Sequence, residues 1–297
     1  MSNLVFISGE FGSGTTLLFT LFRKTPGFHC LYEPLHGQLP EFLVWRDRVY
    51  EHHFFVEDYY SEYKGFTQVA QLFSPDWATT RLALSPNDEA DDLYRYLSYL
   101  IGMSFGKAPG VVLKENRFAF RLGWLRAEFP RARVIHIYRD PEEQWASLVR
   151  RVQGHLGRQD VGQESVEYQG FRLAATCDDL TTAFPELDAS NFRTAYARFA
   201  KLMELSRAEQ ERYAHVSVDY ADLVGDFQNV CPRIASAIGV DLDVEHLNQF
   251  VVLDPNRELN NRPHSLPQRL RRLVERGGRS YARIRVQAAK RRAKASS

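Results

Sequence analysis

The sequence predicts an α/β protein with a central parallel sheet flanked by helices. Three short apolar runs have the length of buried strands, namely Leu4–Ile7, Val111–Lys114 and Arg133–Tyr138. The first run continues into a glycine-rich loop and then into a helix pattern at Thr15–Lys24, which is the first half of a βαβ unit. Because strands alternate with helices, we expect the strands to pair in parallel between layers of helix.

The second half of the fold begins at Val111–Lys114. Apolar residues then recur at helical spacing and predict a helix over Arg117–Phe129, before the strand at Arg133–Tyr138. Pro141 suits the first turn of the next helix, and the two glutamates that follow it favour the positive end of a helix. Val216–Asp219 is expected to be one further strand.

The loop Gly9-Glu-Phe-Gly-Ser-Gly-Thr-Thr16 has the glycine spacing of a phosphate-binding loop but lacks its lysine. Thr15 stands where the lysine would follow Gly14. Backbone N–H groups, the helix N-terminus and the hydroxyls of Ser13, Thr15 and Thr16 remain to hold an anion. We therefore expect a ligand with a shorter anionic group than a triphosphate, such as a nucleotide with one 5′-phosphate.

Arg139 follows the strand at Arg133–Tyr138, and Ser147 lies on the next predicted helix. Open α/β sheets bind ligands at the carboxyl ends of their strands. A guanidinium and a hydroxyl that converge there can bind a second phosphate. Together with the loop, this predicts a nucleotide that is phosphorylated at two separate places.

The composition is that of a globular protein whose charge is unevenly distributed. The chain has 38 basic and 37 acidic residues, but from Arg262 onward it has 12 Lys or Arg and one acid, Glu275. This basic segment is either a docking element or a solvated tail. The three cysteines predict neither a disulfide framework nor a metal pair, and no apolar run has the length of a membrane span, so we expect a cytoplasmic protein.

Three parts of the sequence resemble sulfotransferases. Gly9-Glu-Phe-Gly-Ser-Gly-Thr-Thr-Leu-Leu18 resembles their 5′-phosphosulfate loop, usually G-x-P-[RK]-S-G-T-T-L, and Arg139-Asp-Pro141 with Ser147 is similar to their 3′-phosphate element. Tyr220-Ala-Asp-Leu-Val224 and the helix that ends at Ile238-Gly239 resemble a third family stretch. The three blocks occur in the family's order and cover about half of the chain.

The resemblance implies a P-loop NTPase-like sulfotransferase fold with helical insertions. It implies 3′-phosphoadenosine 5′-phosphosulfate as donor, adenosine 3′,5′-bisphosphate as product, and no required metal. The donor would be bound by Gly12, Ser13, Gly14, Thr15 and Thr16 on its 5′ side and by Arg139 and Ser147 on its 3′ side. We expect a single domain over residues 1–297, with acceptor-side insertions at about 35–110 and 150–212 and a basic segment at about 262–297.

Glu33 is the candidate general base. It lies in Leu31-Tyr-Glu-Pro-Leu-His36, close to the spacing from the loop at which the tyrosylprotein branch of the family has its basic glutamate. His36 is the substitute candidate, because the cytosolic branch uses a histidine. A turn or capping role for Glu33 is the structural alternative.

The sequence departs from the family pattern at Gly12 and Phe11, where a basic residue and a proline are usual. The sulfuryl oxygens or the bridging oxygen then need another cation. Lys114, at the end of its strand, is the expected replacement, since related proteins have a lysine at a comparable place. Weaker candidates are Arg117, Arg23 and Lys24.

The acceptor and the adenine site are less defined. The aromatic residues of Tyr50–Phe66 either line an acceptor pocket or form core, and the acceptor is a small molecule, a lipid, a glycan or a tyrosine-containing chain. The candidates for adenine stacking are Trp124, Trp145 and Phe227, and the basic segment around Arg276-Gly-Gly-Arg279 is a candidate clamp for the 3′-phosphate.

Two other functions remain open from the sequence. A nucleotide kinase would need the missing loop lysine and a strand-end aspartate for Mg²⁺. A non-catalytic nucleotide-binding scaffold would use the basic segment to dock on an acidic partner. We do not expect nucleic-acid binding, because the basic segment lacks interleaved aromatic residues and a recognisable module.

Overall fold

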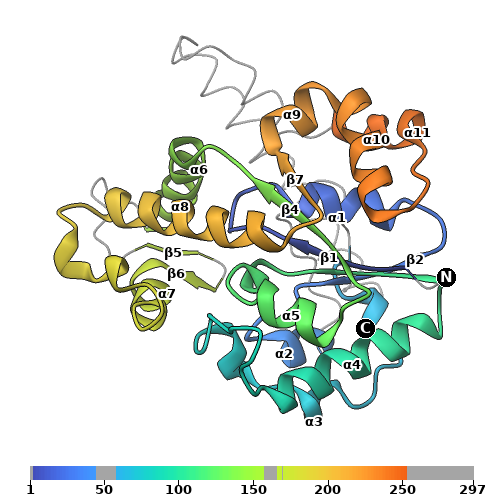
Figure 1. Cartoon of the computed structure of the whole chain (residues 1–297), viewed down its shortest axis with the longest axis horizontal. Helices are drawn as coiled ribbons and strands as arrows, with labels where there is room; N and C mark the ends of the chain where they lie inside the picture. The colour runs from blue at the N-terminus through green and yellow to red at the C-terminus, as the bar shows by residue number, and fades with distance from the viewer. Residues whose placement is uncertain (1–2, 45–57, 157–165, 169, 253–297) are drawn as a thin grey trace, which may run out of the picture. The chain divides into compact units, whose positions relative to one another are not determined.

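Five parallel strands form the centre of the protein in a computed structural model, which describes residues 3–44, 58–156, 166–168 and 170–252 (Figure 1). The order in the sheet is β2-β3-β1-β4-β7, and all four neighbouring pairs are parallel. The strands are β1 (Asn3–Ser8), β2 (Phe28–Tyr32), β3 (Gly110–Lys114), β4 (Arg133–Tyr138) and β7 (Val216–Asp219).

The predicted parallel α/β fold is therefore confirmed. Four of the five strands were expected from their apolar runs, and β2 was not. β2 is an edge strand of only five residues, and two of them, Phe28 and His29, are half-buried, so its sequence lacks a continuous buried run. Its register pairs Tyr32 with Lys114 of β3, which brings the residue before Glu33 next to the end of a central strand.

Alternating side chains of the strands sort into two cores, one on each face of the sheet. Val5 and Ile7 of β1 pack with α1, α9, α10 and α11, whereas Leu4 and Phe6 pack with α4 and α5. This alternation follows from the period of two along a strand. Both faces of the sheet are covered, as is usual for parallel sheets (Figure 1).

The helices agree with the sequence at most of their starts. α1 begins at Thr15 and α6 at Pro141, as predicted, but the single helix expected over Arg117–Phe129 is wrong. The structure has a 3-10 helix at Asn116–Phe118 and a separate helix from Leu122, because the Glu115 side chain accepts from the Arg117 N–H and starts a tight turn.

The longer helices are α1 (Thr15–Arg23), α4 (Asp91–Phe105), α5 (Leu122–Glu128), α6 (Pro141–Leu156), α7 (Leu173–Leu180), α8 (Ala195–Tyr213), α10 (Phe227–Ile238) and α11 (Val244–Val252), and the shorter ones are α2 (Leu39–Val44), α3 (Val69–Leu72) and α9 (Tyr220–Gly225).

A third core lies beside the sheet and joins α7, α8 and a hairpin. The hairpin pairs β5 (Glu167–Tyr168) with β6 (Phe171–Arg172) and was not expected from the sequence. Phe171 and Leu173 pack with Phe199 of α8 in this core. No helix in the described part of the chain is long and apolar enough to cross a membrane.

The aromatic segment belongs to the core as far as it is described. Tyr59, Tyr63 and Phe66 are buried, and their rings pack on neighbouring aromatic rings from β2 and α4. Tyr50, Phe54 and Phe55 lie outside the described residues. In the described part of the segment, these three rings therefore belong to the core.

Candidate active site

All five strands of the sheet end at the same edge, and each end contributes to the candidate site. β1 continues into the glycine loop, and β3 ends at Lys114. Glu33, Arg139 and Tyr220 directly follow the last residues of β2, β4 and β7. This edge is the carboxyl edge at which open α/β sheets bind ligands.

The glycine loop is shaped by two residues with positive φ. Gly12 has φ 84° and Gly14 has φ 102°, a region that residues with a Cβ rarely adopt. The loop closes with a hydrogen bond from Ser13 N–H to the carbonyl of Glu10. No side chain caps α1, whose first N–H groups cannot bond within the helix and are left for a ligand.

Ser13 offers a second feature that fits an anion. Its Oγ is buried and has no hydrogen-bond partner among the residues that the structure describes. Ser13 and Arg139 line the same cavity of about 240 Å³, together with Gln144 at the start of α6. Buried hydroxyls are nearly always paired in folded proteins, so this one is consistent with a bound ligand in the functional state.

Tyr220 joins the loop to Arg139. A Cβ on Gly14 would lie 2.2 Å from Cδ2 of Tyr220, so the ring packs directly on the loop. The Arg139 guanidinium lies 4.9 Å above the same ring and pairs with Glu143 at 3.0 Å. Ser147 lies half-buried on α6, two turns after Arg139. The structure therefore places the loop and Arg139, which are distant in sequence, on one aromatic ring.

Glu10 is a buried acid inside the loop that the sequence argument did not use. Its carboxylate accepts from Ser206 Oγ at 2.7 Å, and Gln210 links Ser206 to Ser8. Burial raises the pKa of Glu10 to about 7, although the bond from Ser206 and the charge of Arg117 oppose the rise. Burial thus favours the protonated form of Glu10, next to a loop that suits an anion.

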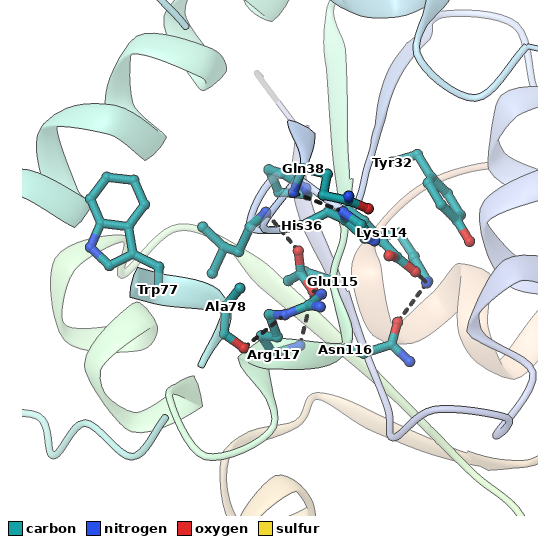
Figure 2. Close-up of polar contacts among 12 residues, drawn as sticks. Tyr32, His36, Gln38, Trp77, Ala78, Lys114, Glu115, Asn116 and Arg117 are labelled. Carbon is teal, nitrogen blue, oxygen red and sulfur yellow. Dashed lines mark hydrogen bonds and ion pairs between the residues drawn. The ribbon is translucent and has the colours of Figure 1, made fainter. Parts of the chain in front are cut away.

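Glu33 and Lys114 form a buried ion pair at the ends of β2 and β3. Lys114 Nζ lies 2.5 Å from Glu33 Oε1 and 2.5 Å from Asn116 Oδ1, and it sits 4.5 Å above the ring of Tyr32 (Figure 2). The Tyr32 hydroxyl in turn is 3.3 Å from Thr16 Oγ1 of α1. Tyr32 therefore connects the start of the loop helix with the ion pair, a role that no sequence motif indicates.

The backbone holds Glu33 in a defined position. Its N–H donates to the Lys114 carbonyl at 2.8 Å, and its φ of 41° turns the chain away from the sheet. Burial by itself raises the pKa of Glu33, but the charges of Lys114 and Arg117 and the hydrogen bond from Lys114 outweigh burial and hold the pKa well below the usual range. Glu33 is therefore an ionised carboxylate at neutral pH, which is the form that accepts a proton.

His36 lies close to the pair but has a different state. The Gln38 N–H donates to His36 Nδ1 at 3.2 Å, so the neutral ring carries its hydrogen on Nε2 (Figure 2). Burial, together with the charges of Arg117 and Lys114, lowers the pKa of His36. In this arrangement His36 is a hydrogen-bond donor through Nε2 and has no free acceptor nitrogen.

Arg117 completes the cluster from the turn after β3. Its Nη1 lies 3.2 Å from Glu115 Oε1, and its Nε donates to the Ala78 carbonyl at 3.2 Å (Figure 2). Glu115 is fully buried and also accepts from the Leu35 N–H at 2.7 Å. The guanidinium lies 5.3 Å above the ring of Phe11, so Arg117 contacts the loop itself.

The other sequence candidates lie in less suitable places. Arg23 pairs with Glu62 and donates to the Asp58 carbonyl, and Lys24 lies over the ring of Phe250. Trp124 and Phe227 are buried in the two cores of the sheet, so neither is free to stack on a base; the half-buried Trp145 packs on Tyr196 and Phe199. The basic segment from Arg262 lies outside the described residues.

Comparison with known proteins agrees with this geometry. A family model described as the sulfotransferase family matches residues 5–244. Among solved structures, sulfotransferase STF1 from Mycobacterium tuberculosis H37Rv aligns with a TM-score of 0.50 at 18% identity, over 85% of this chain and 71% of that one. At this identity the likeness shows the fold.

Two further solved structures align over most of the chain. They are sulfotransferase STF9 from Mycobacterium avium (17% identity, TM-score 0.45, 89% of this chain and 69% of that one) and mouse sulfotransferase SULT7A1 complexed with PAP (10% identity, TM-score 0.42, 89% and 68%). No curated protein sequence matches the chain.

Proposed function

Because the chain belongs to the sulfotransferase family, we propose that it transfers a sulfuryl group from 3′-phosphoadenosine 5′-phosphosulfate to a hydroxyl or an amine of an acceptor. One observation carries the choice of donor. A glycine loop without a lysine and the strand-end Arg139 lie against the same ring, that of Tyr220. This arrangement suits a nucleotide with separate 5′ and 3′ anionic groups better than it suits a triphosphate.

The loop and the start of α1 would bind the 5′ side of the donor. The uncapped N–H groups of α1, the buried Ser13 Oγ and the hydroxyls of Thr15 and Thr16 are donors for a phosphate. The backbone of Gly12 and Gly14 lets the chain approach the anion closely. Arg139 and Ser147 would bind the 3′-phosphate, which a guanidinium can hold with two parallel hydrogen bonds.

Glu33 acts as the general base in this proposal. The acceptor oxygen forms a bond to sulfur as the bond from sulfur to the 5′-phosphate oxygen breaks, and the acceptor proton passes to Glu33. The leaving bisphosphate keeps the electron pair of the broken bond. His36 is not the base in this proposal, because the Gln38 N–H occupies Nδ1 and Nε2 carries a hydrogen.

Lys114 is proposed to serve the leaving oxygen. In the structure its ammonium lies between Glu33 and Asn116 and next to Tyr32, which contacts Thr16 of the loop helix. A positive charge at this place stabilises the negative charge that develops on the bridging oxygen. Attraction of Lys114 toward the donor would also weaken its hold on Glu33 and make Glu33 a stronger base.

Nothing in the described residues selects the acceptor, which stays a small molecule, a lipid, a glycan or a tyrosine-containing chain. We also propose a single domain over residues 1–297 and a cytoplasmic location. The kinase alternative is weakened by the missing loop lysine, and the scaffold alternative by the buried Glu33–Lys114 pair, which binding alone does not require.

The test is a transfer assay without divalent metal. The purified chain is incubated in EDTA with the phosphosulfate donor and a panel of phenols, alcohols and amines, and products are detected by a mass increase of one sulfuryl group. We expect sulfated product together with adenosine 3′,5′-bisphosphate. Turnover of ATP that depends on Mg²⁺, with no sulfated product, would instead favour the kinase.

A further inference from the structure

The loop lacks a cation at Gly12, and the described residues offer few groups that could replace it. Arg23 is engaged by Glu62 and Asp58, and Lys24 lies over Phe250. Lys114, bound by Glu33 and Asn116, is already assigned to the leaving oxygen, so the sulfuryl oxygens need another cation. Gly12 itself has φ 84°, so a basic side chain at this position would strain the backbone.

Arg117 differs from these residues because one of its terminal nitrogens has no hydrogen-bond partner among the described residues. Nε donates to the Ala78 carbonyl, and Nη1 donates to Glu115, whereas Nη2 makes no hydrogen bond to a residue that the structure describes. The side chain is 4% exposed, so its charge is little screened by water. Glu115 and Ala78 thus fix the guanidinium and leave Nη2 available.

Nη2 of Arg117 faces the same small space as His36 Nε2. A Cβ atom on Gly170 would lie 2.9 Å from Nη2 and 3.7 Å from Nε2, and Gly170, with φ 81°, leaves this space open. Because His36 carries its hydrogen on Nε2, both nitrogens are donors. Two converging donors, one of them charged, make a niche for anionic oxygens.

The niche lies between the loop and the base. Arg117 packs on Phe11 of the loop on one side. Burial has the largest effect on the pKa of Glu10, Glu33 and His36, and the charge of Arg117 lowers the pKa of all three groups. Its field therefore reaches both the loop acid and the candidate base, where a transferring group would lie.

We propose that Arg117 supplies the positive charge that the loop lacks at Gly12, and that its Nη2, with His36 Nε2–H, binds the sulfuryl oxygens of the donor. The inference rests on the proposed function. Sulfur keeps its three peripheral oxygens while it passes from the phosphate oxygen to the acceptor oxygen, so the two donors bind oxygens that take part in neither the breaking nor the forming bond. The sulfuryl group is thus recognised from the β3 side of the site.

The test compares two nucleotides that differ only in the sulfuryl group. Calorimetry measures the affinity of the wild type, Arg117→Ala and the control Arg126→Met for 3′-phosphoadenosine 5′-phosphosulfate and for adenosine 3′,5′-bisphosphate. Arg126 is a partly buried arginine that donates to the Tyr213 carbonyl, away from the site. We expect Arg117→Ala to bind the phosphosulfate about 10- to 100-fold more weakly and the bisphosphate almost unchanged, with the control like the wild type.

Two additions keep the test decisive. If Arg117→Ala does not fold, Arg117→Lys retains a buried charge beside Glu115, and its single ammonium cannot serve both Glu115 and the sulfuryl oxygens, so the same donor-specific loss is expected. In folded Arg117→Ala, sulfate release is measured as the rate at which the sulfuryl group of the phosphosulfate passes to water. Millimolar N-methylguanidinium should raise this rate about tenfold. A purely structural role for Arg117 would give no such rescue.

The outcomes separate the inference from the proposed function. Equal losses of affinity for the two nucleotides, or unchanged affinity and sulfate release in both variants, overturn the role of Arg117. If the Arg117 variants change only the KM for the acceptor, Arg117 contacts the acceptor, and its proposed role at the sulfuryl oxygens is overturned as well. If the wild type binds neither nucleotide, the proposed function itself fails.

Discussion

The two halves of the candidate site are built in different ways. On the donor side, the loop Gly9–Thr16 presents mostly backbone N–H groups and hydroxyls, and Arg139 brings a positive charge from the end of β4. On the base side, four charged residues from β2, β3 and the turn after β3 form two buried ion pairs, Glu33 with Lys114 and Glu115 with Arg117. In the proposed function, mainly backbone groups and hydroxyls would bind the donor, and side-chain charges would act on the transferring group.

Because the two sides are built differently, we expect them to respond differently to substitution. A backbone cradle is fixed by the fold and loses little when one side chain changes. A buried ion pair leaves an uncompensated charge when one partner is removed, which is costly. We therefore expect the large effects on chemistry from the base side and the effects on nucleotide affinity from the donor side.

The largest expected effect is on the base side. Glu33→Gln keeps the size of the side chain but cannot take a proton, so turnover should fall by about 100- to 10,000-fold, as is typical when a general base is lost. Turnover is measured with an acceptor found in the mass-shift assay, and affinity for the bisphosphate serves as the folding control. Retained turnover in Glu33→Gln with a loss in His36→Ala would move the role of base to His36.

Glu10 tests whether a buried charge on the donor side is as costly as one on the base side. Its pKa is raised from about 4.5 to about 7, so the folded state holds a proton that the unfolded chain has already lost. The resulting stability is fully present below about pH 4.5 and is lost as the pH rises through about 7, and it amounts to about 3 kcal/mol.

Glu10→Gln should remove this dependence. Its free energy of unfolding, measured with urea at pH values from 5 to 8, should fall by less than that of the wild type, with the difference approaching about 3 kcal/mol. Half-buried His29 and buried His136, whose pKa values are lowered to about 4 and about 3 mainly by burial, titrate equally in both proteins. Parallel pH curves for the two proteins would show that Glu10 is ionised in the folded state throughout.

Arg139→Ala tests whether Arg139 binds the 3′-phosphate of the donor. Loss of a charged hydrogen-bond donor should weaken adenosine 3′,5′-bisphosphate about 10- to 100-fold and leave AMP, which lacks the 3′-phosphate, unchanged. Calorimetry with both nucleotides measures this, and Glu143→Gln, which removes only the ion-pair partner of Arg139, is the matched control. Equal losses for both nucleotides would place Arg139 elsewhere than at the 3′-phosphate.

The smallest effect is expected at the link between the two sides. Tyr32→Phe removes the hydroxyl that lies 3.3 Å from Thr16 Oγ1 but keeps the ring under Lys114. The free energy of unfolding should fall by about 0.5–1.5 kcal/mol, the usual net value of one hydrogen bond. Thermal or urea unfolding measures the change, and a fall in bisphosphate affinity above tenfold would show that Tyr32 itself contacts the donor.

The donor side could be predicted from the sequence because its residues are contiguous or follow obvious strands. The loop Gly9–Thr16 and the strand before Arg139 carry local signals, namely glycine spacing and β-branched runs. The sequence also indicated Glu33 and Lys114, but only through a resemblance to a family. Their direct contact follows from the register of β2 on β3, and β2 is a short edge strand without a continuous apolar run.

Other parts of the site have no local signal at all. Tyr32 contacts Thr16 of the loop helix, and Gly170 lies beside Arg117 and His36, which are far from it in the chain. The buried state of Glu10 depends on Ser206 of α8, almost 200 residues away. The expected helix over Arg117–Phe129 was wrong for a related reason, because the Glu115 side chain, not the apolar spacing, decides where the turn begins.

The most direct measurement is calorimetry of the wild-type chain with adenosine 3′,5′-bisphosphate, AMP and ADP in EDTA. In the proposed function, this edge of the sheet binds a nucleotide with separate 5′ and 3′ anionic groups. We expect the bisphosphate to bind at least about 10-fold more tightly than AMP or ADP, because only it reaches both the loop and Arg139. Tighter binding of ADP than of the bisphosphate would contradict this proposal and would indicate that the loop binds a nucleoside triphosphate.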